Sequence, residues 1–235
     1  QTFLVSGGGL ATELKEGLFN YVPDLDGVAH SEGDEIILKI VRDANQIKKR
    51  GLEYVLNSGQ LNPYLISTKK NGRPMILYDG GRPSNLDDLP FADLDFLKED
   101  VDGNNLLEKY IKNPVWGTAA NNSSATSFTM ERSTTFVSSR GCPYACSFCY
   151  RGSQGERNYG MRSPENLVKE FKLHMEKYNV DFIGMPDDNF AVSYERIKEL
   201  HPLLKPLGMR WGTHLRLDES AGLKPDTKNK LNYIF

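Results

Sequence analysis

The sequence predicts an α/β protein in which two successive series of strands and helices each build a parallel sheet. Short β-prone segments alternate with amphipathic helices near the N-terminus, and the same alternation resumes after residue 131. An irregular polar stretch separates the two series. The length of 235 residues allows one or two domains. We therefore expect a first domain over residues 1–80, a connector over 81–130 and a second domain over 131–235.

The first series begins with an expected strand at residues 2–5, which are apolar and β-prone. This strand runs into a serine and three glycines, a composition typical of a tight strand-to-helix turn. Thr12 is the expected cap of a short helix that continues to about Tyr21. Residues 27–30 then predict a second strand.

A longer helix is expected over residues 34–50, where isoleucine, valine and alanine recur at helical spacing. Gly51 is the expected end of this helix, and residues 52–56 predict a third strand. Because the connections are short, strands and helices in this order imply a parallel sheet. Two more apolar runs, 65–67 and 75–78, flank a Lys-Asn-Gly sequence and predict a β-hairpin.

The second series starts with a β-prone strand at residues 134–138. Ser163 is the expected cap of the next helix, which has proline in its first turn. Residues 180–185 and 209–217 predict two further strands, with a helix capped by Ser193 between them. A repeated strand–loop–helix unit is how a (β/α) barrel begins, and such barrels carry catalytic groups at the C-terminal ends of their strands.

The three cysteines of the chain, Cys142, Cys146 and Cys149, all lie within residues 142–149. An odd number of thiols in one short loop cannot pair off as disulfides, and a chain without other cysteines is typical of a reducing compartment. We therefore expect a cytoplasmic protein. Soft thiolates at this density indicate an iron–sulfur cluster or zinc. Three ligands would leave one iron of a [4Fe–4S] cluster open for chemistry, as in metal sites that keep a free coordination position.

The spacing Cys-x3-Cys-x2-Cys, with the aromatic Phe148 directly before the third cysteine, resembles the signature of the radical S-adenosylmethionine (radical SAM) family. The resemblance implies that the three cysteines hold a [4Fe–4S] cluster and that S-adenosylmethionine binds at its open iron, with Phe148 in the binding site. It also implies reductive cleavage of S-adenosylmethionine to a 5′-deoxyadenosyl radical. Such chemistry needs an electron donor such as a flavodoxin or a ferredoxin.

Residues 185–190, which read Met-Pro-Asp-Asp-Asn-Phe, follow the second expected strand of this series. They resemble the Asp-Asp-x-Phe variant of the cobalamin-linked branch of the family, at a place where other members carry Gly-Gly-Glu. The resemblance implies that this turn accepts a hydrogen bond from the amino group of S-adenosylmethionine. The acceptor is the carboxylate of Asp187 or Asp188, or a backbone carbonyl of Met185 or Pro186. A cap of the following turn is the alternative role of the two acidic residues.

Arg216, near the end of the third expected strand, is a candidate partner for the carboxylate of the cofactor or of the substrate. A guanidinium group suits planar anions of this kind. An ion pair with Asp218, two residues further on, is the alternative.

The first series resembles the C-terminal half of the Rossmann-like cobalamin-binding domain that precedes many radical SAM barrels. Gly7 and Gly8 match the glycine pair that lets the backbone approach the nucleotide tail of cobalamin, although a tight turn needs glycines as well. Residues 30–35 resemble a Gly-Glu-Gly-Glu element with substitutions, and residues 86–91 resemble the connector between the two domains. The cobalt-ligating Asp-x-His-x-x-Gly motif is not in the sequence. Either this motif lies upstream of Gln1, where we also expect the first half of the sheet, or cobalamin is not bound.

Together these features predict part of a Rossmann-like cobalamin-binding domain followed by the first half of a radical SAM partial (β/α) barrel. The expected cofactors are a [4Fe–4S] cluster, S-adenosylmethionine and cobalamin. The expected reaction is methylation or rearrangement of a small metabolite or lipid. One alternative is a cobalamin-independent enzyme, such as a methylthiotransferase-like RNA modifier. The other is a non-catalytic iron–sulfur or zinc module, although structural zinc normally needs four protein ligands and no histidine has finger-like spacing.

The charge and hydropathy of the chain indicate neither a nucleic-acid partner nor a membrane span. Lys and Arg number 29 against 31 Asp and Glu, which gives a net charge of −2 without a block of like charge. A basic face for nucleic acid is therefore not indicated. The apolar runs are too short to span a membrane, and no signal peptide is visible. A small-molecule substrate is the expectation that fits best.

Overall fold

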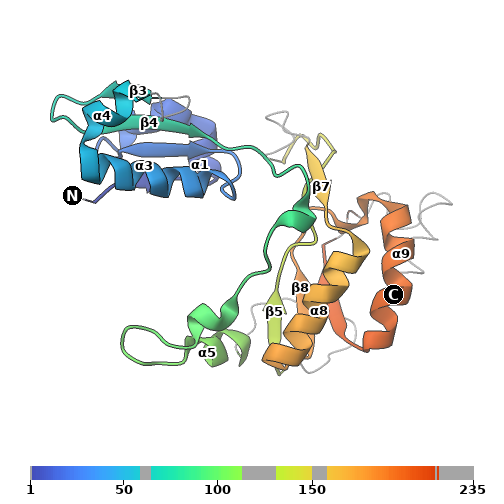
Figure 1. Cartoon of the computed structure of the whole chain (residues 1–235). Coiled ribbons are helices and arrows are strands. Elements are labelled where there is room, and N and C mark those ends of the chain that lie inside the picture. The colour runs from blue at the N-terminus through green and yellow to red at the C-terminus, as the bar shows by residue number, and fades with distance from the viewer. Residues whose placement is uncertain (1, 59–64, 113–130, 150–157, 215, 217–235) are drawn as a thin grey trace. The chain divides into compact units, whose positions relative to one another are not determined.

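The computed structural model describes residues 2–58, 65–112, 131–149, 158–214 and 216 (Figure 1). The chain divides into two compact units, Gln1–Ser84 and Asn85–Phe235. Both units are mixed α/β structures that contain parallel strands. No helix in the described part of the chain has the length and apolar character needed to cross a membrane.

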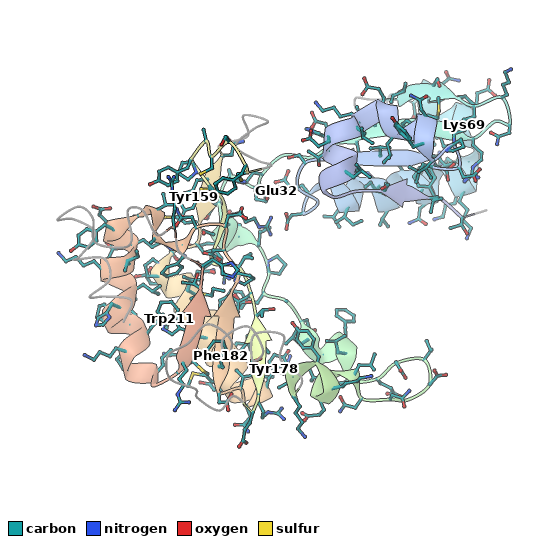
Figure 2. All side chains as sticks on the ribbon, turned by 180° about the vertical axis from the view of Figure 1, so that it is seen from behind. Glu32, Lys69, Tyr159, Tyr178, Phe182 and Trp211 are labelled. Atoms are coloured by element: carbon teal, nitrogen blue, oxygen red, sulfur yellow. The ribbon has the colours of Figure 1, made fainter. Side chains whose placement is uncertain are left out.

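The first unit is built on a four-stranded sheet with the order β1-β2-β4-β3. Its strands are β1 (Val5–Ser6), β2 (Gly27–His30), β3 (Leu65–Thr68) and β4 (Pro74–Asp79). Strands β1, β2 and β4 run parallel, and β3 pairs antiparallel with β4. The hairpin predicted around the Lys-Asn-Gly sequence is therefore confirmed. Lys69 between its strands, labelled in Figure 2, donates hydrogen bonds to the carbonyls of Pro23 and Leu25 ahead of β2.

Helices cover both faces of this sheet. Alternate residues of β4 point to opposite faces, and the two sets pack against different helices. Ile76 and Tyr78 pack with the buried Ile36 and Ile40 of one helix. Met75 and Leu77 instead pack with a cluster that the first two helices contribute. The helices are α1 (Gly9–Leu14), α2 (Leu18–Tyr21), α3 (Ile36–Arg50) and α4 (Leu52–Asn57).

Two expectations for the first unit are wrong. Residues 52–56 form helix α4 and not a strand, so the third parallel strand is β4. The run is short enough to fit either period, and Gly51 at φ 82° breaks α3 so that the chain can start a second helix. Thr12 lies inside α1 and does not cap it; its Oγ1 accepts a hydrogen bond from the Ser31 amide at 3.0 Å.

The core of the second unit is a parallel sheet with the order β5-β8-β9. The strands are β5 (Ser133–Thr135), β8 (Phe182–Met185) and β9 (Arg210–Thr213). The helices between them, α8 (Pro164–Tyr178) and α9 (Tyr194–Leu204), begin at the predicted caps. Ser163 accepts a hydrogen bond from the Asn166 amide, and Ser193 accepts one from the Arg196 amide, each at 3.2 Å.

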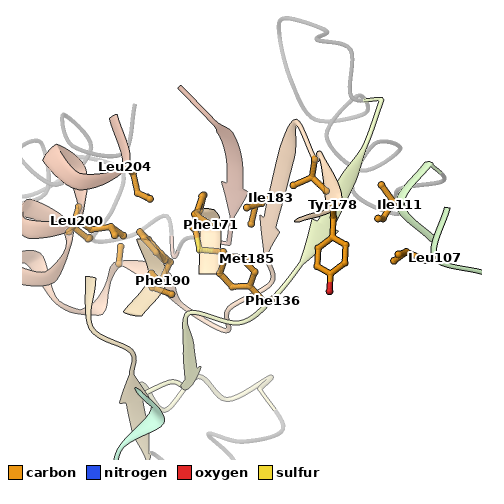
Figure 3. Packing of buried hydrophobic residues seen from close by; sticks show 14 residues of the cluster. Leu107, Ile111, Phe136, Phe171, Tyr178, Ile183, Met185, Phe190, Leu200 and Leu204 are labelled. Carbon is orange, nitrogen blue, oxygen red and sulfur yellow. The ribbon is translucent and has the colours of Figure 1, made fainter. Parts of the chain in front are cut away.

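The hydrophobic core of the second unit lies between β8 and the two helices (Figure 3). All four residues of β8 are buried, as a central strand requires. Phe171 of α8 meets Phe136 edge-on, with ring centroids 5.4 Å apart. The ring centroid of Phe190, after β8, lies 5.5 Å from that of Trp211 on β9. Trp211 is labelled in Figure 2.

A small antiparallel hairpin departs from the sequence prediction for the second unit. The expected strand over 134–138 is shorter, and the chain pairs again as β6 (Ser139–Gly141) with β7 (Tyr159–Met161). Residues Gly141 and Tyr159 face each other in this ladder. The hairpin therefore joins the two ends of the segment that carries the cysteines. Strand β9 ends at Thr213, whereas the sequence predicted a strand up to residue 217.

From Asn85 on, the described part of the expected connector belongs to the second unit. It contains two 3₁₀ turns, η2 (Leu86–Asp88) and η3 (Leu94–Leu97), and helix α5 (Leu106–Lys112). Asp87 accepts a hydrogen bond from the Ser163 amide at 2.9 Å, at the start of α8. Leu107 and Ile111 of α5 enter the same core as Phe136. This segment thus helps to cover the edge of the sheet next to β5 (Figure 1).

Candidate functional site

The candidate site lies where β5, β8 and β9 end. The three strands are parallel, so their C-terminal ends meet at one edge of the sheet. The cysteine loop follows β5 through β6, and the Asp187 turn follows β8 directly. The amide of Phe190 donates a hydrogen bond of 3.2 Å to the His214 carbonyl, which ties the segments after β8 and β9 together. Three segments distant in sequence therefore converge at this edge.

All three cysteines are free and half-buried. The amide of Cys149 donates a hydrogen bond to the Cys146 carbonyl at 3.0 Å, so the two residues share one tight turn. Within the described residues, no three His, Cys, Asp or Glu side chains converge closely enough to hold a metal ion. Three accessible thiols in one loop are nevertheless soft donors of the kind that bind an iron–sulfur cluster or zinc. Phe148 of the same loop is 91% exposed.

Arg216 contacts the cysteine loop. Its guanidinium carbon lies 3.9 Å from the centroid of the Tyr144 ring, which is cation–π geometry. Arg216, three positions after β9, is thereby brought to a residue between the first two cysteines. Asp218, the alternative partner of Arg216, lies outside the described residues. Tyr144 was not singled out in the sequence, because nothing local marks it as a partner of a residue so far along the chain.

Asp187 is 1% exposed and turns towards the chain that leaves β5. Its Oδ1 accepts a hydrogen bond from the Ser138 amide at 2.8 Å. Its Oδ2 accepts one from the Ser139 hydroxyl at 2.6 Å and another from the Ser138 hydroxyl. Both carboxylate oxygens are thus engaged within the protein. Binding of the S-adenosylmethionine amine by this side chain stays a prediction.

The other residues of this turn have different surroundings. Met185 is buried at the end of β8, while Pro186 and Asp188 are exposed. The cap of the following 3₁₀ turn is Asn189, whose side chain accepts a hydrogen bond from the Ala191 amide at 3.3 Å. The capping role considered for the two acidic residues therefore belongs to their neighbour. Asp188 and the backbone carbonyls remain candidate acceptors for the amine.

Four buried charged or titratable residues next to the site were missed in the sequence. They are Arg162, Glu170, His174 and Arg196. Arg162 pairs with Glu170, and the Nδ1 of His174 lies 2.7 Å from the Thr134 hydroxyl. A signal was present, because Glu170 and His174 lie on the apolar stripe of α8 with Leu167 and Phe171. A charged residue on a buried face needs a partner, and that requirement predicts a polar network.

Burial also shifts the pKa of Arg196 in this network and the pKa of Tyr159 beside it. It lowers the pKa of the Arg196 guanidinium, and the nearby Tyr159 and Asp187 oppose the shift. Burial raises the pKa of the Tyr159 hydroxyl. Tyr159 opens β7 beside the cysteine loop and is labelled in Figure 2. At the base of the loop itself, Ser138 and Ser139 are buried.

The glycine pair of the first unit lies at the end of β1. Gly8 has φ 91°, a conformation that favours glycine, whereas a Cβ on Gly7 would meet the Ala29 Cβ at an ordinary 3.7 Å. At the same edge, the Nδ1 of His30 lies 2.8 Å from Asp79, and both residues end their strands. The tight turn is thus explained by Gly8 alone. The structure does not test the predicted contact of this pair with cobalamin.

Comparison with known proteins gives distant relatives. An uncharacterized methyltransferase of Pyrococcus horikoshii is 26% identical over 210 residues, which cover 88% of this chain and 38% of that protein. An anaerobic magnesium-protoporphyrin IX monomethyl ester cyclase of Rubrivivax gelatinosus is 25% identical over 219 residues, or 92% of this chain and 34% of that protein. A bacteriochlorophyllide d C-12(1)-methyltransferase of Chlorobaculum tepidum is 28% identical over 85 residues, or 35% of this chain and 18% of that protein.

The chain is therefore similar, at low identity, to enzymes named as methyltransferases and as a cyclase. It spans just over a third of the length of the first two relatives, 38% and 34%. No family model matches the chain. No solved structure matches it either.

Proposed function

We propose that the chain is part of a radical SAM enzyme that catalyses methylation or rearrangement of a small metabolite or lipid. The observation that carries the proposal is the placement of the cysteines. Three free thiols with the Cys-x3-Cys-x-aromatic-Cys spacing follow the first strand of a parallel sheet, at the edge where its strands end. The names of the distant relatives, methyltransferase and cyclase, support the reaction class.

In this proposal Cys142, Cys146 and Cys149 ligate a [4Fe–4S] cluster. The bound cluster and S-adenosylmethionine supply radical chemistry by one-electron reduction. The protein positions the reactants: the turn after β8 offers Asp188 and backbone carbonyls to an amine, and Arg216 is placed beside the loop for a carboxylate. The burial of the base of the loop excludes water from one side of the site.

The architecture supports the same proposal. The second unit has the strand–helix alternation with which a (β/α) barrel starts, and its loops at the strand ends carry the candidate ligands. The first unit has three parallel strands, an antiparallel edge strand and helices on both faces of the sheet, which fits part of a Rossmann-like domain. We propose cobalamin as its ligand, on the strength of the Gly7-Gly8 turn and the sequence resemblance. A cytoplasmic enzyme served by a flavodoxin or a ferredoxin completes the proposal.

The test is anaerobic reconstitution with iron and sulfide. The parent chain is expected to bind both in the equal amounts of a [4Fe–4S] cluster, with the broad visible absorption of such clusters. Replacing any one of Cys142, Cys146 and Cys149 by alanine removes a ligand and should abolish most of this absorption. Ser147→Ala, an exposed position in the same loop, is the matched control and should bind as the parent does. Stoichiometric zinc without iron–sulfur absorption would overturn the proposal.

A further inference from the structure

Ser138 is the residue at which the chain leaves the core sheet for the cysteine loop. It lies between β5 and β6, and no part of it is exposed to solvent. From here the chain runs through β6 to Cys142, the first candidate ligand. The direction in which the backbone leaves Ser138 therefore determines where the thiols lie.

Every polar group of Ser138 has a partner. Its amide and its hydroxyl both donate to the carboxylate of Asp187. Its carbonyl accepts two hydrogen bonds, one from the Arg162 amide at 3.0 Å and one from Nη2 of Arg196 at 2.9 Å. The partners come from the turn after β8, from the connection between β7 and α8, and from α9. Ser138 is thus held from three elements that are distant in sequence.

The neighbours of Ser138 are held by the same side chains. The Val137 carbonyl accepts a hydrogen bond from Nη1 of Arg162 at 3.1 Å, and the Ser139 hydroxyl donates to Asp187 at 2.6 Å. Arg196 also donates through Nε to the Arg162 carbonyl at 3.0 Å. The side chains of Asp187, Arg162 and Arg196 therefore fix three consecutive residues at the base of the loop.

Burying these charges is costly for the fold. Asp187 is 1% exposed and Arg196 is 3% exposed. An apolar side chain of similar volume often packs in such a place at no loss of stability, whereas a buried charge must be fully hydrogen-bonded. Fold stability alone therefore does not explain well why charged side chains occupy these two buried positions. The hydrogen bonds to Ser138 give a specific reason.

We infer that Asp187 and Arg196 are positioning residues, which clamp Ser138 and so set the direction and the rigidity of the cysteine loop. The inference rests on the proposed function, because the loop direction matters for catalysis only if the thiols ligate a cofactor. It also assigns the carboxylate of Asp187 to the protein backbone. The amine of S-adenosylmethionine is then left to Asp188 or to the carbonyls of Met185 and Pro186.

Hydrogen–deuterium exchange of the metal-free chain tests the clamp without any cofactor. In Asp187→Ala and Arg196→Met, the amides of residues 138–149 should exchange about tenfold faster or more, because each variant removes hydrogen bonds to a charged group. Arg132→Met is the matched control. Arg132 also donates to backbone carbonyls, those of Tyr178 and Asn179, but it does so at the opposite end of β5. It should leave the exchange of residues 138–149 unchanged.

If Arg196→Met does not fold, Arg196→Lys replaces it, since lysine keeps the charge but loses the fork of donors. A second readout is the rate at which a chelator removes iron after reconstitution, which should rise in the clamp variants and stay at the parental value in Arg132→Met. If the parent takes up no iron, the proposed function fails while the exchange experiment still decides on the clamp. Unchanged exchange in both clamp variants, or an equal rise in the Arg132 variant, would overturn the inference. So would an Asp187→Ala variant that weakens S-adenosylmethionine binding but leaves exchange unchanged.

Discussion

Gly80 is a glycine of the first unit at which an added side chain would collide with the backbone. It follows β4, and its amide donates a hydrogen bond to the His30 carbonyl at 2.9 Å. A Cβ built at this position would lie 2.2 Å from the backbone oxygen of Glu32 and 3.0 Å from that of His30. These oxygens belong to the backbone that leaves β2, so they cannot move aside as a flexible side chain would. Glycine is therefore required here for close approach and not for an unusual φ.

Gly80→Ala is expected to lower the free energy of unfolding by about 1–3 kcal/mol, the usual cost of overpacking. Gly81→Ala is the control, because a Cβ there meets no atom within 4 Å. That change should stay within about 0.5 kcal/mol of the parent. Thermal unfolding followed by circular dichroism, together with hydrogen exchange at β2 and β4, measures both. Equal stability of the two variants would contradict the predicted clash.

Among single residues, the helix caps expected at Ser163 and Ser193 are confirmed and the one at Thr12 is wrong, whereas long-range partners could not be predicted. Ser163 and Ser193 were recognised as caps because a cap is a property of adjacent residues. The partner of Asp187 is separated from it by 49 positions, and no spacing rule connects them. The acidic pair was therefore noticed, but the hydrogen bonds that it makes could be found only in the structure.

Among the elements, length decided which predictions succeeded. Helices α3 and α8, with fifteen residues each, show enough apolar repeats to establish their period. Helix α4 has six residues and was predicted as a strand, because so short a run fits both periods. The hairpin of β6 and β7 was missed, since its two strands have three residues each and pair across the cysteine loop.

Helix α5 is attached to the second unit through Glu108. This carboxylate accepts hydrogen bonds from Arg132 at 2.8 and 2.9 Å and pairs with Lys112 at 3.1 Å. The hydrogen bonds from Arg132 and from Lys112 lower the pKa of Glu108 to about 2. Because the folded-state pKa lies below the ordinary value of 4.5, this group stabilises the fold above pH 4.5. The contribution is lost as the pH falls towards 2.

Glu108→Gln should therefore reduce stability at about pH 7 and have little effect at about pH 2, where the parent carboxylate is itself being protonated. Urea unfolding at several pH values across this window measures the difference between the two proteins. Glu165→Gln on α8 provides a comparison, since Glu165 is an exposed carboxylate on another helix. A difference between Glu108→Gln and the parent that stays constant down to pH 2 would show that lost packing, and not lost charge, causes the effect.

At the scale of the whole molecule, the stability of the first unit depends on β4, the last strand in the sequence of that unit. Strand β4 pairs with β2 on one side and with β3 on the other, and it contributes residues to the packing on both faces of the sheet. A peptide of residues 1–60 lacks β3 and β4 and retains β1 and β2. Two short strands bury too little apolar area to offset the entropy of ordering.

We therefore expect the 1–60 peptide to show no cooperative thermal transition, and a 1–84 chain, which ends at the boundary of the first unit, to show one. Calorimetry of the two fragments under the same conditions is the measurement. A cooperative transition in the shorter fragment would contradict the role given to β4.

The pairing of Gly141 with Tyr159 has a consequence for how the cysteine loop can vary. The hairpin holds both ends of the cysteine loop at neighbouring positions. Formation of the hairpin therefore already includes the entropic cost of bringing the two loop ends together. Each doubling of loop length then adds only about 0.6 kcal/mol. We expect a change in the number of residues between Cys149 and Tyr159 to leave the register of β5, β8 and β9 unchanged, because the ladder of β6 and β7 lies between this segment and the sheet. The length of this loop can therefore differ without a change in the parallel sheet that carries the site.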